Sequence, residues 1–409
     1  CNGNFRHNYL LRRAVPGREV DADEARATVS RGSLVGEATI YFAPVARQRV
    51  LAALDAVRQS SLAYFRPKYR ALKQRLGRVP SLLDFHRLAV ADPLVVATAG
   101  TAKNYGQFLA KMGEELTLAD YQQRVLTFLT AELLNGKRRQ ELLLLSALLN
   151  EGELGQTAYR QQLAAAGCLA DEATLTSVAR VLSLDYFAER ARPTRHDYGD
   201  QPIVVATPRG YRWGPAMAKA LTTPAFIRLV ADAVATGLAL AEQYRPDQPF
   251  TIGKKYTRKD AVRLINNPKN LNAQIISGYY FTNLATGLRE GLFFVSYHKR
   301  PGIKRSKDYQ NDFLGDSALR FFLNARDLKP AAKNVRRLTG GGDRLHLFVQ
   351  HSNSRDQQSY YYLGTCHYQP GSLVELPVSG QPRLAVTLAL DTPLAAELRE
   401  RVTGGGADD

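Results

Sequence analysis

Hydrophobic and polar positions follow two different patterns along the chain. From about residue 41 to 188, a short strand-like run is followed by apolar residues at helical spacing. From Phe250 onward, apolar residues come in short strand-like runs separated by Gly, Asn and Asp clusters: QIISGYYF, GLFFVSYHK, LHLFVQHS, SYYYLGTCHY and RLAVTLAL. The pattern predicts an α+β protein with a helical N-terminal half, followed by a mostly antiparallel, β-barrel-like domain.

These changes in texture divide the chain into five predicted parts. They are a polar, glycine-containing connector (1–40), a helical domain (41–136), a winged-helix-like segment (137–213), a linking helix (214–249) and a β-rich domain (250–409).

The winged-helix-like segment is predicted from three short helices followed by a hairpin. Glycines separate the helices, Asp171 is suited to cap the third, and PIVVATPRGYRWG alternates around a turn at Pro208-Arg209-Gly210. Winged helices often place the third helix in the DNA major groove, in which case Thr174, Ser177 and Arg180 would face outward. The alternative is that the segment is a packing module, as in many large motor proteins.

Positive charge is concentrated in one stretch of the chain. The net charge is +17, and residues 250–345 hold 19 basic and 7 acidic residues, a surplus of 12. Because phosphate contacts release counterions, a basic segment of this kind usually faces a polyanion. The alternative is a surface that only improves solubility.

Basic and aromatic residues alternate within this stretch, as is typical of nucleic-acid binding. Lysine and arginine hold phosphates, and tyrosine rings stack on exposed bases. The candidate residues are Lys254, Lys255, Tyr256, Arg258, Tyr279, Lys299, Lys304, Arg305, Lys307, Tyr309 and Asp312. Strand alternation favours a core position for one tyrosine of each pair. Asp308 and Asp312 either form ion pairs with nearby basic side chains such as Arg258 or accept a hydrogen bond from the exocyclic amine of a cytosine.

No catalytic or metal-binding motif stands out. The chain has no P-loop, H-E-x-x-H or paired C-x-x-C motif, and no G-x-S-x-G elbow. Its three cysteines, Cys1, Cys168 and Cys366, are far apart, which favours a reducing cytoplasm over a disulfide framework. The sequence contains no run of about 18 apolar residues, which is the length that a membrane span requires. We expect no catalytic residue, no metal and no cofactor in this chain.

The order of several segments resembles the C-terminal region of large bacterial superfamily II helicases of the DEAD/DEAH type, which end in a domain of unknown function. The segments are NGNFRHNYLL, YRALKQRLGRVPSLLDF, NYGQFL, NGKRRQELLLL, YTRKDAV, SGYYF, DYQNDF, LHLFVQ and YYYLG. Many of these helicases carry a phospholipase-D-type nuclease at the front. Some are type IV, modification-dependent restriction enzymes whose terminal domain is related to methylcytosine-reading SRA domains.

The resemblance implies DNA contact by the terminal domain. The residues that match its motifs are Tyr256, Thr257, Arg258, Asp260, Gly278, Tyr279, Tyr309, Asp312 and Phe313. It also implies upstream helicase and nuclease domains of the same protein, to which residues 1–40 would connect and which would use ATP and Mg²⁺. Two departures bear on the base that is read: Asn311 stands where an acid is usual, and FFLN (321–324) stands where a Trp-Ser-like pair is usual.

Together these features predict the DNA-binding part of a cytoplasmic restriction or phage-defence protein that recognises methylated duplex DNA and contacts no membrane. Lys299, Lys304, Arg305 and Lys307 would hold phosphates, while Tyr256, Tyr279 or Tyr309 would stack on a flipped base. One alternative is a scaffold that docks on the helicase motor and touches DNA without specificity. Another is a nuclease that uses Asp308 and Asp312 with a divalent metal.

Overall fold

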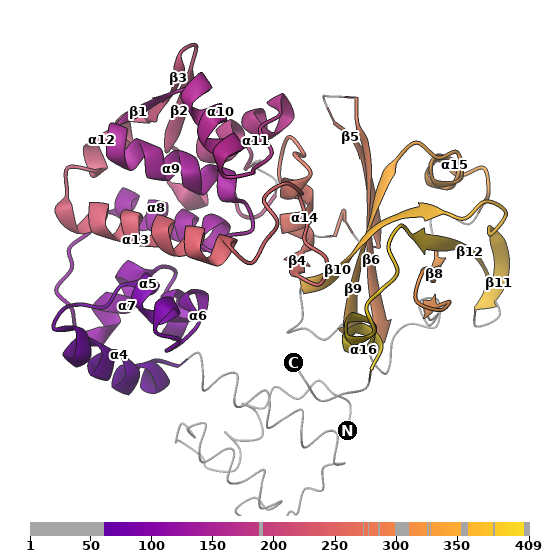
Figure 1. Ribbon diagram of the computed structural model, residues 1–409, viewed down its shortest axis with the longest axis horizontal. Helices are drawn as coiled ribbons and strands as arrows, with labels where there is room; N and C mark the ends of the chain where they lie inside the picture. Colours follow the sequence, from indigo (N-terminus) through magenta and orange to yellow (C-terminus); the bar gives the residue numbers. More distant parts are fainter. Residues whose placement is uncertain are drawn as a thin grey trace, which may run out of the picture. The chain divides into compact units, whose positions relative to one another are not determined.

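The computed structural model describes residues 61–187, 191–272, 274–276, 278–284, 287–298, 311–324, 327, 329–352, 359–378 and 381–404 (Figure 1). It has the predicted mixed α+β fold, with a helical N-terminal half and a C-terminal part made mostly of sheet. By its contacts the chain divides into two compact units, Cys1–Ala131 with Arg228–Thr236, and Glu132–Ile227 with Gly237–Asp409.

The described part of the first unit consists of short helices and the middle of a longer one. The helices are α4 (Leu62–Leu76), α5 (Leu82–Arg87), α6 (Pro93–Thr98), the 3₁₀ turn Ala99–Thr101, α7 (Tyr105–Met112) and α8 (Asp120–Phe128). Ser61, Ser81 and Asn104 cap α4, α5 and α7 by accepting backbone N–H groups of the first turn. The helices bury an aromatic core that includes Phe65, Phe85 and Phe108.

The longer helix, α13 (Pro224–Ala241), has a mean hydropathy of 1.5 over 18 residues, which is apolar enough to cross a membrane by length and composition. The sequence predicted a linking helix at 214–249 but no apolar run of membrane-spanning length, because Arg228 and Asp232 interrupt the apolar residues. Core helices of water-soluble proteins meet the same criterion. Asp232 supports that reading, since its carboxylate accepts the backbone N–H groups of Leu82 and Leu83 at 2.7 and 3.1 Å.

The three helices and the hairpin predicted for residues 137–213 are present in the second unit. Their order is α9 (Arg139–Glu151), β1 (Glu153–Gly155), α10 (Gln156–Ala165), α11 (Glu172–Leu182), β2 (Val204–Thr207) and β3 (Gly210–Trp213). The strands form an antiparallel sheet in the order β1-β3-β2. Asp171 caps α11 as predicted, by accepting the Thr174 backbone N–H. A 3₁₀ turn (His196–Tyr198) precedes the hairpin, and α12 (Pro215–Ala220) follows it.

The C-terminal half is built on a nine-stranded sheet. Its strands are β4 (Lys255–Thr257), β5 (Tyr279–Asn283), β6 (Arg289–His298), β7 (Asp312–Phe313), β8 (Ala318–Phe322), β9 (Arg344–Ser352), β10 (Ser359–Tyr368), β11 (Val374–Val378) and β12 (Gln381–Leu390). The main path runs β5-β6-β9-β10-β12-β8-β7, with β11 on β12 and β4 on β10. Only the β6–β9 pair is parallel among the described strands.

The expectation of a barrel is not met, because the described strands form an open path that ends at β5 and β7. The pattern of short strands could not reveal whether the two edges meet. The sheet is instead buried on both faces. Alternate residues such as Phe293 and Leu347 pack with α15 (Lys333–Thr339) and α16 (Ala396–Thr403), while Phe294 and Phe348 pack with α14 (Arg258–Leu264).

Candidate nucleic-acid interface

The tyrosine of the segment YTRKD belongs to the core. Strand β4 pairs with β10, so that Tyr256 lies opposite Tyr360, and the Tyr256 side chain is 1% exposed. Its hydroxyl accepts the Thr251 backbone N–H at 2.9 Å, and burial raises its pKa to about 12. The predicted stacking of Tyr256 on a base does not fit this position, because the ring offers no open face.

Two basic residues of the longer segment KKYTRKD (254–260) contact aromatic rings of β10. The Arg258 guanidinium donates to the Tyr360 hydroxyl at 2.5 Å and lies 5.1 Å from that ring's centroid. The Lys255 ammonium lies 4.7 Å from the centroid of the Tyr361 ring. Such cation–π contacts hold these half-buried side chains to the sheet and reduce their freedom to follow a DNA backbone.

The remaining lysines of the segment reach polar groups at the surface. Lys254 donates to the Gln243 side-chain oxygen at 3.2 Å, and the exposed Lys259 donates to the Arg192 carbonyl. Both ammonium groups remain at the surface, where phosphate can compete for them.

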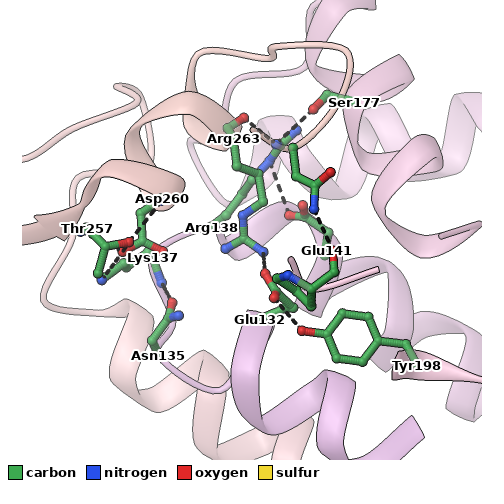
Figure 2. A network of polar contacts seen from close by, with 12 residues as sticks. Glu132, Asn135, Lys137, Arg138, Glu141, Ser177, Tyr198, Thr257, Asp260 and Arg263 are labelled. Carbon is green, nitrogen blue, oxygen red and sulfur yellow. Dashed lines mark hydrogen bonds and ion pairs between the residues drawn. The ribbon is translucent and has the colours of Figure 1, made fainter. Parts of the chain in front are cut away.

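Asp260, one of the residues that match the motifs of the resemblance, has a structural role. The N-cap of α14 is Thr257, and Asp260 completes the capping box by accepting the Thr257 backbone N–H at 2.9 Å. The same carboxylate forms an ion pair with Lys137 at 2.5 Å (Figure 2). Burial alone would raise the pKa of Asp260, but the positive charges of Lys137 and Arg263 outweigh it and lower that pKa.

Arg138 is the centre of the network in Figure 2. The residue is 5% exposed, and its guanidinium donates to the Ser177 hydroxyl at 3.0 Å and to the Thr174 and Arg263 carbonyls at 3.1 and 3.3 Å. Its Nε lies 3.2 Å from the carboxylate of Glu141, which is fully buried. Arg138 therefore links α9, α11 and α14.

A second buried base, Arg263, completes the network. It lies 3.5 Å from the Glu132 carboxylate, which also accepts the Tyr198 hydroxyl at 2.6 Å. Burial raises the pKa of Glu132 despite these two partners. We call Glu132, Lys137, Arg138, Glu141, Asp260 and Arg263 the junction; its three basic and three acidic side chains balance in charge.

Gly136 places the start of the junction against α13. Its φ of +68° lies in the left-handed region, and a Cβ there would come within 2.5 Å of the Ala241 backbone nitrogen and 2.7 Å of the Gly237 carbonyl. The segment NGKRRQE (135–141) thus needs glycine for close packing as well as for its turn.

The outward face predicted for α11 is partly wrong. Thr174 and Ser177 are 3% and 4% exposed, because Arg138 and Asn266 bond to them. Arg180 is half-buried and donates to the Pro268 carbonyl at 2.8 Å. The face that was expected to read DNA therefore packs on the loop that follows α14.

A groove of about 490 Å³ lies between the outer side of α11 and the β2–β3 hairpin. Three of its four charged lining residues form ion pairs, Arg195 with Asp185 at 2.7 Å and Glu172 with Arg160 at 2.5 Å, and the fourth, Arg180, donates to the Pro268 carbonyl. With two acids at its rim, this groove does not suit phosphate.

Tyr279 is also a core residue, 1% exposed, and it donates to the Asp327 carboxylate, which accepts from Asn334 as well. Its predicted stacking on a base therefore does not fit either. The next residue, Tyr280, is only half-buried and contacts Asn267, as strand alternation predicted for one tyrosine of the pair.

Most of the predicted phosphate-binding loop lies outside the described residues: Lys299, Lys304, Arg305, Lys307, Asp308 and Tyr309. Asp312 follows it on β7, half-buried and opposite Arg320 of β8. Its neighbour Asn311 is buried and accepts the Phe322 backbone N–H at 2.9 Å. An amide can fill this accepting role without a charge, which accounts for Asn311 locally.

Most of the other described basic residues of 250–345 fall into two groups. Arg289 and Arg337 pair with Asp343, and Arg344 pairs with Glu290. In contrast, four are exposed, and their side chains form no hydrogen bond or ion pair with described residues: Lys269, Lys329, Lys333 and Arg336. The last three lie on or just before α15, and we call them the α15 cations.

Sequence reasoning missed a buried His–Glu pair. His346 and Glu290, 2% and 1% exposed, approach within 3.0 Å through Nε2 and Oε2, and His346 Nδ1 lies 3.0 Å from the Tyr362 hydroxyl. Burial lowers the pKa of His346; for Glu290, hydrogen bonds from His346 and Arg344 outweigh burial and lower the pKa. The two residues lie 56 positions apart, and no local spacing signals their contact.

No group of three His, Cys, Asp or Glu side chains among the described residues could hold a metal ion. Of the two acids in the nuclease alternative, Asp312 lies on β7 and Asp308 lies outside the described residues.

The geometry defines a mixed α+β chain whose second unit joins a helical segment to a terminal sheet through the junction. Residues 65–246 match a family model described as a domain of unknown function (DUF8090). Residues 250–402 match a second, also described as a domain of unknown function (DUF3427). No curated protein matches the chain.

Proposed function

We propose that this chain is the DNA-binding C-terminal part of a bacterial helicase-type restriction or phage-defence protein. In this proposal the terminal sheet domain contacts DNA and recognises a methylated base, and upstream helicase and nuclease domains supply ATP- and Mg²⁺-dependent steps. The support comes from the order of family-like segments and from the charge surplus of residues 250–345.

One observation carries the proposal. Part of the positive charge of 250–345 is paired with acidic side chains at the junction and near it. In contrast, the α15 cations are exposed to solvent and have no acidic partner among the described residues. The sequence holds five further basic residues at 299–307, which lie outside the described residues. Exposed lysine and arginine side chains without an acidic partner can replace the counterions that surround phosphates.

The candidate list changes accordingly. Tyr256 and Tyr279 leave the proposed base-stacking set because they are core residues, and Tyr309 stays in it. Asp312, half-buried directly after the basic loop, remains the proposed reader of an exocyclic amine. The support for a relation to methylcytosine-reading SRA domains is the sequence resemblance to the helicase C-terminal region.

A second candidate function, a docking scaffold for the motor, is favoured by the junction. The order of elements in 137–213 supports a winged-helix reading, and its third helix is packed on the terminal domain through Thr174, Ser177 and Arg180. We infer that this winged helix acts as a packing module and does not read the groove.

The test compares binding of the whole chain to plain, methylated and hydroxymethylated duplexes of one sequence across a salt series. The whole chain is needed because a fragment from residue 250 lacks Lys137 and Arg138. A preference of about tenfold, or about 1.4 kcal/mol, for one modified duplex is expected. Equal affinity for all three would exclude base recognition, and no measurable binding would favour the scaffold.

A further inference from the structure

Helix α4 carries a concentration of positive charge to which no function has been assigned above. Its 15 residues, LAYFRPKYRALKQRL, include five basic residues and no acidic one. The helix is well formed, with a Ser61 N-cap and Gly77 in the left-handed conformation at its C-terminal end. It belongs to the first unit, whereas residues 250–345 belong to the second.

Only two of the five basic side chains have a partner within the described residues. Lys73 pairs with Glu114 at 2.5 Å, and Lys68 donates to the Tyr64 hydroxyl at 2.6 Å. The side chains of Arg66, Arg70 and Arg75 are exposed and form no hydrogen bond or ion pair with described residues.

The exposed face has a regular layout. Phe65, Tyr69 and Leu72 are buried. At about 100° per residue, the opposite ridge consists of uncharged side chains, Ala63, Pro67, Ala71 and Gln74, all of them exposed. Arg66 and Arg70 border this ridge on one side, and Lys68 and Arg75 border it on the other.

This layout is unfavourable for the isolated protein. Arg66 and Arg70 are four positions apart, where like charges destabilise a helix by about 0.2–0.5 kcal/mol. Fold stability accounts for Lys73, which pairs with Glu114, and in part for Arg75, which lies in the last helical turn, where a cation is favourable. It does not account for Arg66 and Arg70, because the helix buries its aromatic side and needs no cation in its first turns on the other.

We propose that the exposed face of α4 binds the phosphate backbone of duplex nucleic acid as a second contact, separate from the terminal domain. A duplex carries one charge per about 1.7 Å of its axis, so the roughly 13 Å from Arg66 to Arg75 spans several phosphates. Because its uncharged ridge is flanked by basic side chains on both sides, α4 is suited to lie between two rows of phosphates. A lipid surface fits less well, because membrane-lying helices turn large apolar side chains outward, and those of α4 point into the core.

The experiment measures affinity of the whole chain for a plain duplex of about 30 base pairs across a salt series. The variant is R66A/R70A/R75A, and the matched control is K111A/K219A/R401A, which removes three exposed basic residues elsewhere. We expect the α4 variant to bind at least tenfold more weakly near 100 mM salt, with a salt slope smaller by about 2–3. The control should stay within about twofold of the wild type.

A charge-preserving variant, R66K/R70K/R75K, separates lost contact from lost folding and should bind within about threefold of the wild type. If the α4 variant binds duplex like the control, the proposal is wrong. Loss of binding to phosphatidylserine vesicles with unchanged duplex binding would instead identify a lipid contact and also overturn it. The terminal-domain proposal fails separately, because it depends on the α15 cations and not on α4.

Discussion

Two groups of basic residues in this chain differ in what surrounds them. At the junction, the buried Arg138 and Arg263 and the half-buried Lys137 face Glu132, Glu141 and Asp260. Arg66, Arg70 and Arg75 on α4 are exposed and have no acidic partner among the described residues. The number of basic residues in the sequence does not distinguish these two groups. The comparison teaches that the distant acids and the burial of each base decide whether it holds the fold together or is available to a partner.

The largest expected effect follows from replacing Arg138 with alanine. This change leaves the fully buried Glu141 without its ion-pair partner and removes the bonds to Ser177 and Thr174. Breaking a buried pair typically costs about 3–5 kcal/mol. We expect the free energy of unfolding, measured in urea, to fall by that amount. The neighbouring R139A is the control and should change it by less than about 0.5 kcal/mol; a similar small effect of R138A would show that the junction is not structural.

A smaller effect is expected for the coupling between Lys137 and Asp260. A double-mutant cycle with K137M and D260N isolates the pair from the capping role of Asp260. Because the 2.5 Å contact is mostly shielded from water, the coupling energy should lie between about 0.5 and 3 kcal/mol. Additive effects of the two changes would mean that each residue stabilises the protein independently of the other.

The buried His346–Glu290 pair predicts how stability depends on pH. Both pKa values are lowered in the folded state, so the unfolded chain binds more protons when the solution is acidified. The free energy of unfolding should fall as the pH drops below about 6.5, where unfolded histidine protonates, and fall further below about 4.5 as glutamate protonates. One group contributes at most about 1.4 kcal/mol per pH unit.

The variant H346Q should flatten the dependence between pH 6.5 and 5, whatever its effect on stability at neutral pH. H86Q is the matched control, because the half-buried His86 side chain forms no hydrogen bond or ion pair with described residues, and this variant should change the slope less than H346Q does. Parallel curves for H346Q and the wild type would contradict the assigned role of His346.

Local sequence was sufficient for several elements and insufficient for the site. The cap at Asp171, the β2–β3 hairpin and the change from helix to sheet near Phe250 depend on neighbouring residues and were predicted. The role of YTRKD was misjudged, because Asp260 meets Lys137 across 123 positions and Tyr256 is covered by β10. Whether a sheet closes is likewise a matter of long-range pairing, which the alternation within each strand does not encode.

The most direct test of the central claim measures the salt dependence of duplex affinity for the wild type and for K329A/K333A/R336A, with K111A/K219A/R401A as the control. The account predicts that removing the α15 cations weakens binding and reduces the salt slope by about 2–3, while the control changes little. Equal slopes for all three proteins would contradict the claim that the exposed cations of the terminal domain hold DNA.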